Sequence, residues 1–155
     1  MPGILVGVDG SDQSRRALAW AMHEAIQHKV PLTVMNVRPG SVRPATHIYW
    51  NMPTLPEGGL STEQEHAAVQ EFVDQVAHEI GETPPEVTIE VVTGDPAEEL
   101  VRASRDADQL VVGRRGGGGF HRLMMGSVSS KITHHAACPV TVICGPGEAS
   151  RGSAE

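Results

Sequence analysis

The sequence predicts one α/β domain, a doubly wound five-stranded parallel sheet with helices on both faces. The chain has 155 residues, which suits a single domain with one core. Five short apolar runs alternate with longer segments whose apolar residues recur at helical spacing. Strands that are apolar throughout are typical of a parallel sheet buried on both faces, with right-handed connections.

The N-terminal part predicts a strand, a helix, a strand and a loop. The apolar, β-branched run 4–8 stops at Asp9-Gly10-Ser11, which indicates a buried strand and a turn. Residues 12–28 show helical spacing, and 32–37 form the second strand. The Pro- and Gly-rich segment 39–60 predicts an irregular loop. It carries Tyr49 and Trp50, which either form a lid or pin the loop to its own domain.

The remaining elements follow from capping patterns and apolar runs. Ser61 and Thr62 precede Gln64 and Glu65 by three residues, a capping-box pattern that begins a helix ending at Gly81. A third strand covers 87–92, and Asp95-Pro96 begins the next helix as N-cap and first helical residue. A fourth strand ends at Gly113, a last helix contains Val128, Ile132 and Ala136, and a fifth strand covers 139–144. The domain is therefore expected over 1–145, with 146–155 as a flexible tail.

The charge distribution favours a small anionic ligand. The chain has 12 basic and 19 acidic residues, a net charge of −7, which argues against a general nucleic-acid binder or a protein that binds anionic membranes. Between Asp108 and Glu148 there is no acidic residue, and the four basic ones are Arg114, Arg115, Arg122 and Lys131. The alternative is chance clustering on a solvated face.

Cysteine and histidine usage predicts neither a disulfide nor a metal site. On one strand Cys138 and Cys144 would lie about 20 Å apart, too far for a disulfide, so we expect buried free thiols and a reducing cytoplasm. His134 and His135 are adjacent and point about 100° apart on a helix, and no HxxxH or CxxC occurs. The N-terminus lacks a basic region and a long apolar run, and no segment approaches a membrane-spanning length.

A phosphate site is predicted at one edge of the sheet. Asp9, Val37 and Gly113 all end strands, so they should share the edge at which open parallel sheets bind ligands. The glycines after Gly113 allow close backbone approach to an anion, and Gly126 opens a helix whose free N–H groups favour phosphate. The P-loop pattern, the dinucleotide pattern GxGxxG and the SGGxDS pattern are absent. As alternatives, Asp9 is a plain helix N-cap and Ser127 only starts a helix.

The glycine spacing carries a family resemblance. Gly113-x-x-Gly116, nine further residues and Gly126-Ser127 combine with VGVDGS in the first strand and CPVTVI in the last. This combination resembles the universal stress protein family, in its ATP-binding branch, over residues 3–144. The resemblance implies a Rossmann-like fold of the adenine nucleotide alpha hydrolase type, a homodimer, here expected through strand 139–144, and ATP as ligand with Mg²⁺.

The resemblance also implies roles for individual residues. Asp9 would bind the ribose with Gly7 nearby, and the backbone of Val37 would meet the adenine. The phosphates would be held by Gly113, Arg115, Gly116 and Gly117 and, from the helix side, by Gly126, Ser127, Val128 and Ser129.

Three functions remain open from the sequence: a nucleotide-dependent regulatory module in the stress response, a slow ATPase or phosphotransferase, and a structural or chaperone-like dimer with a vestigial site. Fast phosphoryl transfer requires a carboxylate that holds the metal and a group that orients the nucleophile. Asp9 is assigned to ribose and Asp95 to a cap, so we expect binding without catalytic residues. A vestigial site would have lost glycines or Ser127, and all are present.

Overall fold

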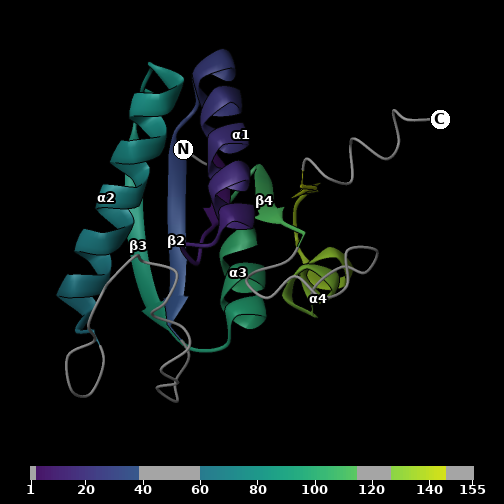
Figure 1. The fold of residues 1–155 in the computed structure, drawn as a ribbon. Helices are drawn as coiled ribbons and strands as arrows, with labels where there is room; N and C mark the ends of the chain where they lie inside the picture. The colour runs from purple at the N-terminus through teal and green to yellow at the C-terminus, as the bar shows by residue number, and fades with distance from the viewer. Residues whose placement is uncertain (1–2, 39–59, 115–126, 146–155) are drawn as a thin grey trace.

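The structure, a computed structural model, describes residues 3–38, 60–114 and 127–145. Strands and helices alternate along these residues: β1 Ile4–Gly7, α1 Asp12–His28, β2 Leu32–Arg38, α2 Thr62–Ile80, β3 Val87–Thr93, α3 Pro96–Ser104, β4 Gln109–Gly113, α4 Ser127–His135 and β5 Val140–Ile143. The order confirms the predicted alternation (Figure 1). The predicted loop 39–60 with its aromatic pair and the predicted tail 146–155 lie outside the described residues, except for Leu60.

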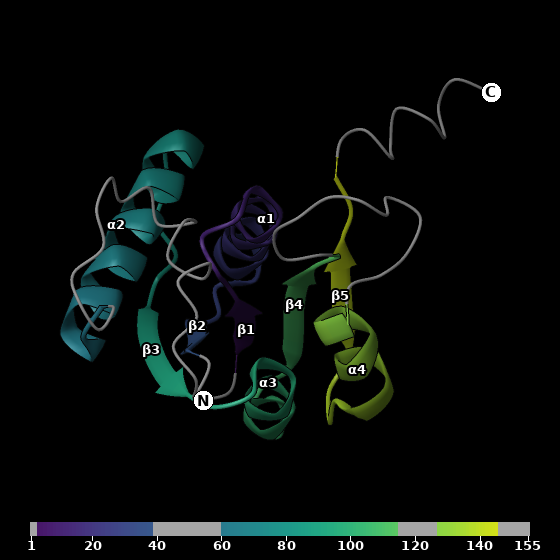
Figure 2. The same cartoon turned by 60° about the horizontal axis from the view of Figure 1, so that its bottom comes forward.

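The five strands form one parallel sheet in the order β3-β2-β1-β4-β5. Ile4 of β1 aligns with Leu32 of β2 on one side and with Gln109 of β4 on the other. Helices α1 and α2 cover one face, and α3 and α4 cover the other (Figures 1 and 2). The doubly wound fold is therefore confirmed, and the strand order reverses between β1 and β4.

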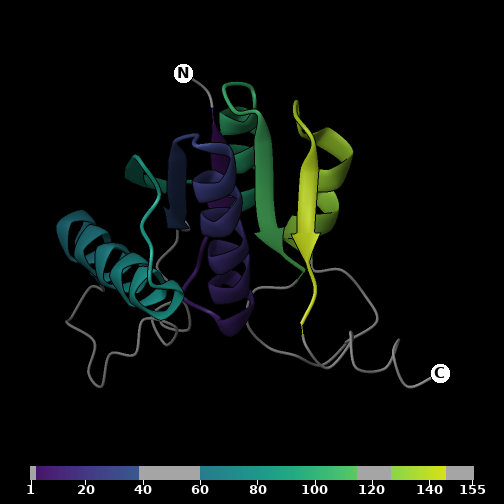
Figure 3. The same cartoon turned by 90° about the horizontal axis from the view of Figure 1, so that it is seen from above.

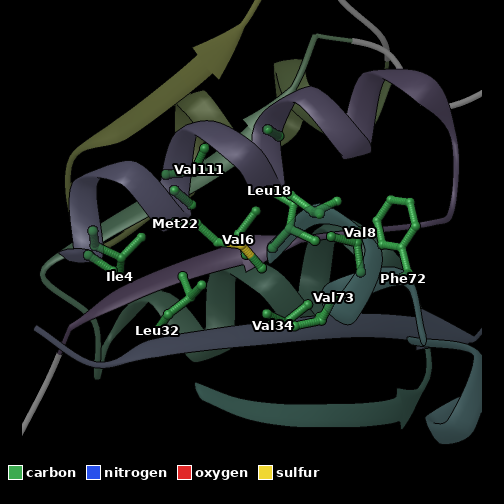
Figure 4. Packing of buried hydrophobic residues seen from close by; sticks show 14 of the residues in the cluster. Ile4, Val6, Val8, Leu18, Met22, Leu32, Val34, Phe72, Val73 and Val111 are labelled. Atoms are coloured by element: carbon green, nitrogen blue, oxygen red, sulfur yellow. The ribbon is translucent and has the colours of Figure 1, made fainter. Parts of the chain in front are cut away.

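The core consists of two apolar clusters, one on each face of the sheet. Val6, Leu18 and Val34 are fully buried between the sheet and helices α1 and α2 (Figure 4). Leu5 and Leu110 belong to the second cluster, on the side of α3 and α4. Adjacent residues of β1 enter different clusters because side chains alternate along a strand.

Strand β3 differs from the expected strand that is apolar throughout. Val87 and Ile89 pack against the cluster under α1 and α2, whereas Thr88 and Glu90 are exposed. β3 is an edge strand, and in the described part of the chain only Val92 of its second face, near the carboxyl end, packs against the cluster on the side of α3 and α4. In Figure 2, α3 and α4 lie away from β3, towards the other end of the sheet. A half-covered strand needs apolar side chains on one face only, which explains the alternation.

Polar side chains cap the N-termini of α1, α2 and α3. Ser61 and Gln64 form the predicted capping box of α2, and Asp95 caps α3 by accepting from the N–H of Glu98 at 3.0 Å. The cap of α1 is Ser11, whose hydroxyl accepts from the N–H of Ser14 at 3.2 Å. The alternative that Asp9 is the helix N-cap was therefore wrong.

The two cysteines flank β5 and both are free. Cys138 is half-buried, and burial, together with the charge of Asp108, raises the pKa of its thiol. Cys144 is exposed, so the expectation that both thiols are buried was wrong, because the apolar run ends one residue earlier, at Ile143. Among the residues described, no helix is long and apolar enough to cross a membrane.

Candidate functional site

Asp9 lies two residues beyond the end of β1, half-buried at the carboxyl edge of the sheet. Its Oδ1 accepts a hydrogen bond from the N–H of Ser11 at 2.9 Å, and its own N–H donates to Oγ of Ser14 at 3.3 Å. These contacts hold the carboxylate in the turn before α1. Within the described residues Oδ2 has no hydrogen bond, so this oxygen can accept one from a ligand.

A buried asparagine sets the position of this turn relative to β2. The Nδ2 group of Asn36 donates to the carbonyl oxygen of Val8 at 2.9 Å, and the N–H of Val8 donates to Met35 at 2.9 Å. Both the N–H and the carbonyl group of Val8, the residue directly before Asp9, are thus hydrogen-bonded to β2. The sequence reasoning missed Asn36, although a lone amide inside an otherwise apolar strand was a usable signal.

Val37 lies near the end of β2, and its half-buried side chain packs into the cluster on the side of α3. Because a valine side chain has no polar group, Val37 can offer a ligand only the polar groups of its backbone. This arrangement is compatible with the expected backbone role.

Gly113 ends β4 and connects it to two helices. Oγ of Ser129, in the first turn of α4, donates to the carbonyl oxygen of Gly113 at 2.6 Å. A Cβ atom at Gly113 would lie only 2.9 Å from the backbone oxygen of Gln13 in α1. The glycine is therefore required for the close approach of α1, whatever its role towards a ligand.

Gly7 has a similar packing role on the other face. A Cβ atom at this position would lie 2.9 Å from Cδ1 of Leu100 in α3. Gly7 lies two residues before Asp9, and the close approach that the structure shows at Gly7 is to helix α3. Close packing explains this glycine without a ligand.

The start of α4 supplies the helix end of the site. Ser127 is exposed at its first residue, Val128 packs into the cluster under α3 and α4, and Ser129 is buried. The hydroxyl proton of Ser129 is already donated to Gly113. Ser127 therefore has the available hydroxyl, while the backbone N–H groups of the first turn have no partner within the helix.

The strands run in the same direction through the sheet (Figure 3). Asp9, Val37 and Gly113, which lie at or near the carboxyl ends of β1, β2 and β4, therefore come to one edge. Asp9 follows β1 and Gly113 is the last residue of β4, and the strand order reverses between these two strands. The other predicted phosphate-binding residues, Arg115, Gly116, Gly117 and Gly126, lie outside the described residues.

The structure describes two of the four basic residues between Asp108 and Glu148, Arg114 and Lys131. Nζ of Lys131 lies 3.9 Å from Oδ2 of Asp95 in a contact exposed to solvent, so this lysine is directed towards α3. Arg114 is half-buried, and its backbone N–H donates to the carbonyl oxygen of Ile143 at 3.0 Å. Among the described residues no cluster of histidine, cysteine or acidic side chains could hold a metal ion, and the six histidines in that part are exposed.

Comparison with known proteins identifies the family. The model of the universal stress protein family matches residues 2–143. A curated universal stress protein of Mycolicibacterium smegmatis is 36% identical over 154 residues, 97% of this chain and 51% of that protein. The chain therefore belongs to the universal stress protein family, and it spans about half the length of the curated relatives it matches.

Solved structures agree with this assignment. The universal stress protein UspA from Lactobacillus plantarum superposes with a TM-score of 0.69 at 27% identity, over 92% of this chain and 97% of that one. A universal stress protein crystallised in complex with cAMP superposes with a TM-score of 0.64 at 22% identity, over 92% and 96% of the two chains. The second likeness concerns the fold alone.

Proposed function

We propose that this protein binds an adenine nucleotide, ATP with Mg²⁺, and acts as a nucleotide-dependent regulatory module in the stress response. The observation that carries the proposal is the half-buried Asp9 carboxylate, held by the turn with Oδ2 unused, at the point where the strand order reverses. Open parallel sheets bind nucleotides at this point. The relative crystallised with cAMP supports an adenine nucleotide as the ligand class.

Each described part of the edge suits a different part of the nucleotide. Oδ2 of Asp9 accepts a hydrogen bond from a ribose hydroxyl, and the backbone of Val37 meets the adenine. The free N–H groups of α4 and the Ser127 hydroxyl face the phosphates, because a helix N-terminus favours negative charge. Arg115, Gly116, Gly117 and Gly126, assigned from the sequence pattern, complete the phosphate site.

The test is calorimetric titration of the whole chain with ATP, ADP, AMP and cAMP, followed by the Asp9→Asn variant. A hydrogen bond to a charged group contributes about 1.5–3 kcal/mol, so this variant should bind ATP at least about tenfold more weakly. Asp12→Asn, at an exposed carboxylate in the first turn of α1, is the matched control and should leave the affinity unchanged. Equal affinity of wild type and Asp9→Asn would remove Asp9 from the site.

Hydrolysis should be much slower than binding. At the described carboxyl edge Asp9 is assigned to ribose and Asp95 caps α3 through the N–H of Glu98, so neither carboxylate is assigned to orient a water molecule. Donors that hold ground state and transition state equally well increase affinity without increasing rate. In single-turnover experiments with excess protein and labelled ATP we expect hydrolysis over minutes or longer, below the roughly 1 s⁻¹ of slow typical enzymes. Turnover of several per second would make the protein an enzyme.

We also propose a homodimer through β5. Its residues Val140–Ile143 carry no charge and form the open edge of the sheet next to β4, so a second copy can pair there about a two-fold axis. Sedimentation should show a dimer at micromolar concentration that Val142→Glu dissociates. Because Val142 also packs into the cluster under α3 and α4, thermal unfolding must show that the variant is folded. A wild-type monomer would contradict the proposal.

A further inference from the structure

We propose that the open edge of β3, with the groove beside it, binds a basic, extended segment of a partner protein as a sixth strand. This surface involves the amino end of β1 and the start of β3, whereas the proposed nucleotide site lies at the carboxyl edge. The two proposals therefore rest on different residues and can fail independently.

The edge of β3 is long and regular. All seven residues Val87–Thr93 pair in register with β2, and β3 is the outermost strand on this side of the sheet (Figure 2). Val87, Ile89 and Val91 pack against the cluster under α1 and α2, which holds the strand in place. The outer backbone groups of such a strand are a template for an added strand.

A groove of about 350 Å³ lies on the face of β3 that carries Thr88 and Glu90. Strands β1, β2 and β3 contribute to it, and the end of α3 borders it. Three carboxylates line it, those of Glu86, Glu90 and Asp106, and no basic residue does. Among the described residues no basic side chain forms an ion pair with any of these three carboxylates.

The charge pattern indicates which partner fits. Glu86 and Glu90 lie on the same face as Thr88, at every second residue, so a paired strand would face them with alternate side chains. Opposite charges across neighbouring strands attract, which favours Lys or Arg at alternate positions. Charged side chains on an edge strand often serve to prevent pairing with another chain. Asp106 does not belong to β3 but to the segment after α3, so the acidic residues of the groove are not confined to the edge strand.

A second copy of this chain fits this edge poorly. Glu90 is the middle residue of β3, so a two-fold pairing of β3 with its copy would place two Glu90 carboxylates opposite each other. Like charges at directly opposed positions are destabilising. The β5 edge carries no charge and has no such repulsion. We therefore assign the second copy of the chain to β5 and the basic segment of a partner protein to β3.

The experiment uses a labelled peptide of about nine residues that alternates Lys and Val, titrated with the whole chain and followed by fluorescence anisotropy. We expect binding that weakens with added salt, as charge pairs at a surface do. Glu90→Lys should weaken it about tenfold or more, since it replaces an attraction by a repulsion. Glu71→Lys, at an exposed residue of α2, is the matched control and should bind like wild type apart from the same small change in net charge.

Two further peptides test the strand geometry. The first is an isomer with all lysines grouped at one end, which loses the alternate spacing. The second is a copy N-methylated on alternate backbone nitrogens, which loses the backbone donors. Both should bind at least about fivefold more weakly. Equal binding of the isomer, or an equal loss in Glu71→Lys, would mean attraction to net charge alone and overturn the proposal. So would the absence of binding, or a self-association through β3 that Glu90→Lys abolishes. ATP affinity should be the same in Glu90→Lys and wild type.

Discussion

ATP binding should be lost when Gly126 is replaced by glutamate. Gly126 directly precedes Ser127, the first residue of α4, where the free N–H groups favour an anion. A glutamate there brings its own negative charge to the place proposed for phosphate and adds a side chain to it. Since like-charge juxtaposition in a binding site costs several kcal/mol, we expect affinity to fall about a hundredfold or more in calorimetric titration.

The control for this variant is Ala67→Glu, which adds the same charge at an exposed position of α2. Both variants should keep the far-UV circular dichroism of wild type, and Ala67→Glu should also keep its ATP affinity. Wild-type affinity in Gly126→Glu would place the nucleotide away from the start of α4. The proposed single-turnover assay can use the same variant to exclude a contaminating ATPase.

Gly113→Ala should lower the free energy of unfolding by about 1–3 kcal/mol, the usual cost of excess volume in a packed interior. The new Cβ would lie 2.9 Å from the backbone oxygen of Gln13, so β4 or the first turn of α1 must move. Both segments border the proposed site, and we therefore expect weaker ATP binding as well. Thermal unfolding should show a melting temperature about 2–10 °C lower.

Gly7→Ala is the matched control, because its Cβ would also lie 2.9 Å from another atom. That atom is Cδ1 of Leu100, the end of a flexible side chain, which can turn away. Alanine also removes the entropic cost of a glycine inside a strand, about 0.5–1 kcal/mol. Gly7→Ala should thus be close to wild type in stability, and an equal loss in both variants would contradict the distinction between backbone and side-chain contacts.

Much of the fold could be predicted because its signals are local. The capping box of Ser61 and Gln64 and the Asp95-Pro96 start of α3 depend on residues three or fewer positions apart, and both are confirmed. The bounds of β1, β2 and β3 differ from the predicted ones by one residue at the carboxyl end, and those of β5 by one residue at each end, since strand ends depend on pairing with neighbours that the sequence does not show. Predictions for the phosphate loop remain predictions.

Tertiary contacts explain the errors and omissions. Asp9 resembles a helix cap in sequence, but the structure gives that role to Ser11, whose hydroxyl faces the first turn of α1. The contact between Asn36 and Val8 joins residues far apart in the chain, so no spacing rule indicates it. The two glycines at positions 7 and 113 look alike in sequence and differ in what lies against them.

The sequence by itself determined the element order, the parallel sheet, the family and the edge at which the proposed ligand residues gather. These properties follow from apolar periodicity, capping patterns and glycine spacing, which act within short stretches of chain. Only the tertiary structure decided that β3 is an edge strand, that the hydroxyl of Ser129 donates to Gly113, and that the carboxylates of Glu90 and Asp106 line one groove. Such contacts join residues that lie on separate elements, and their distances are set by how the helices pack on the sheet.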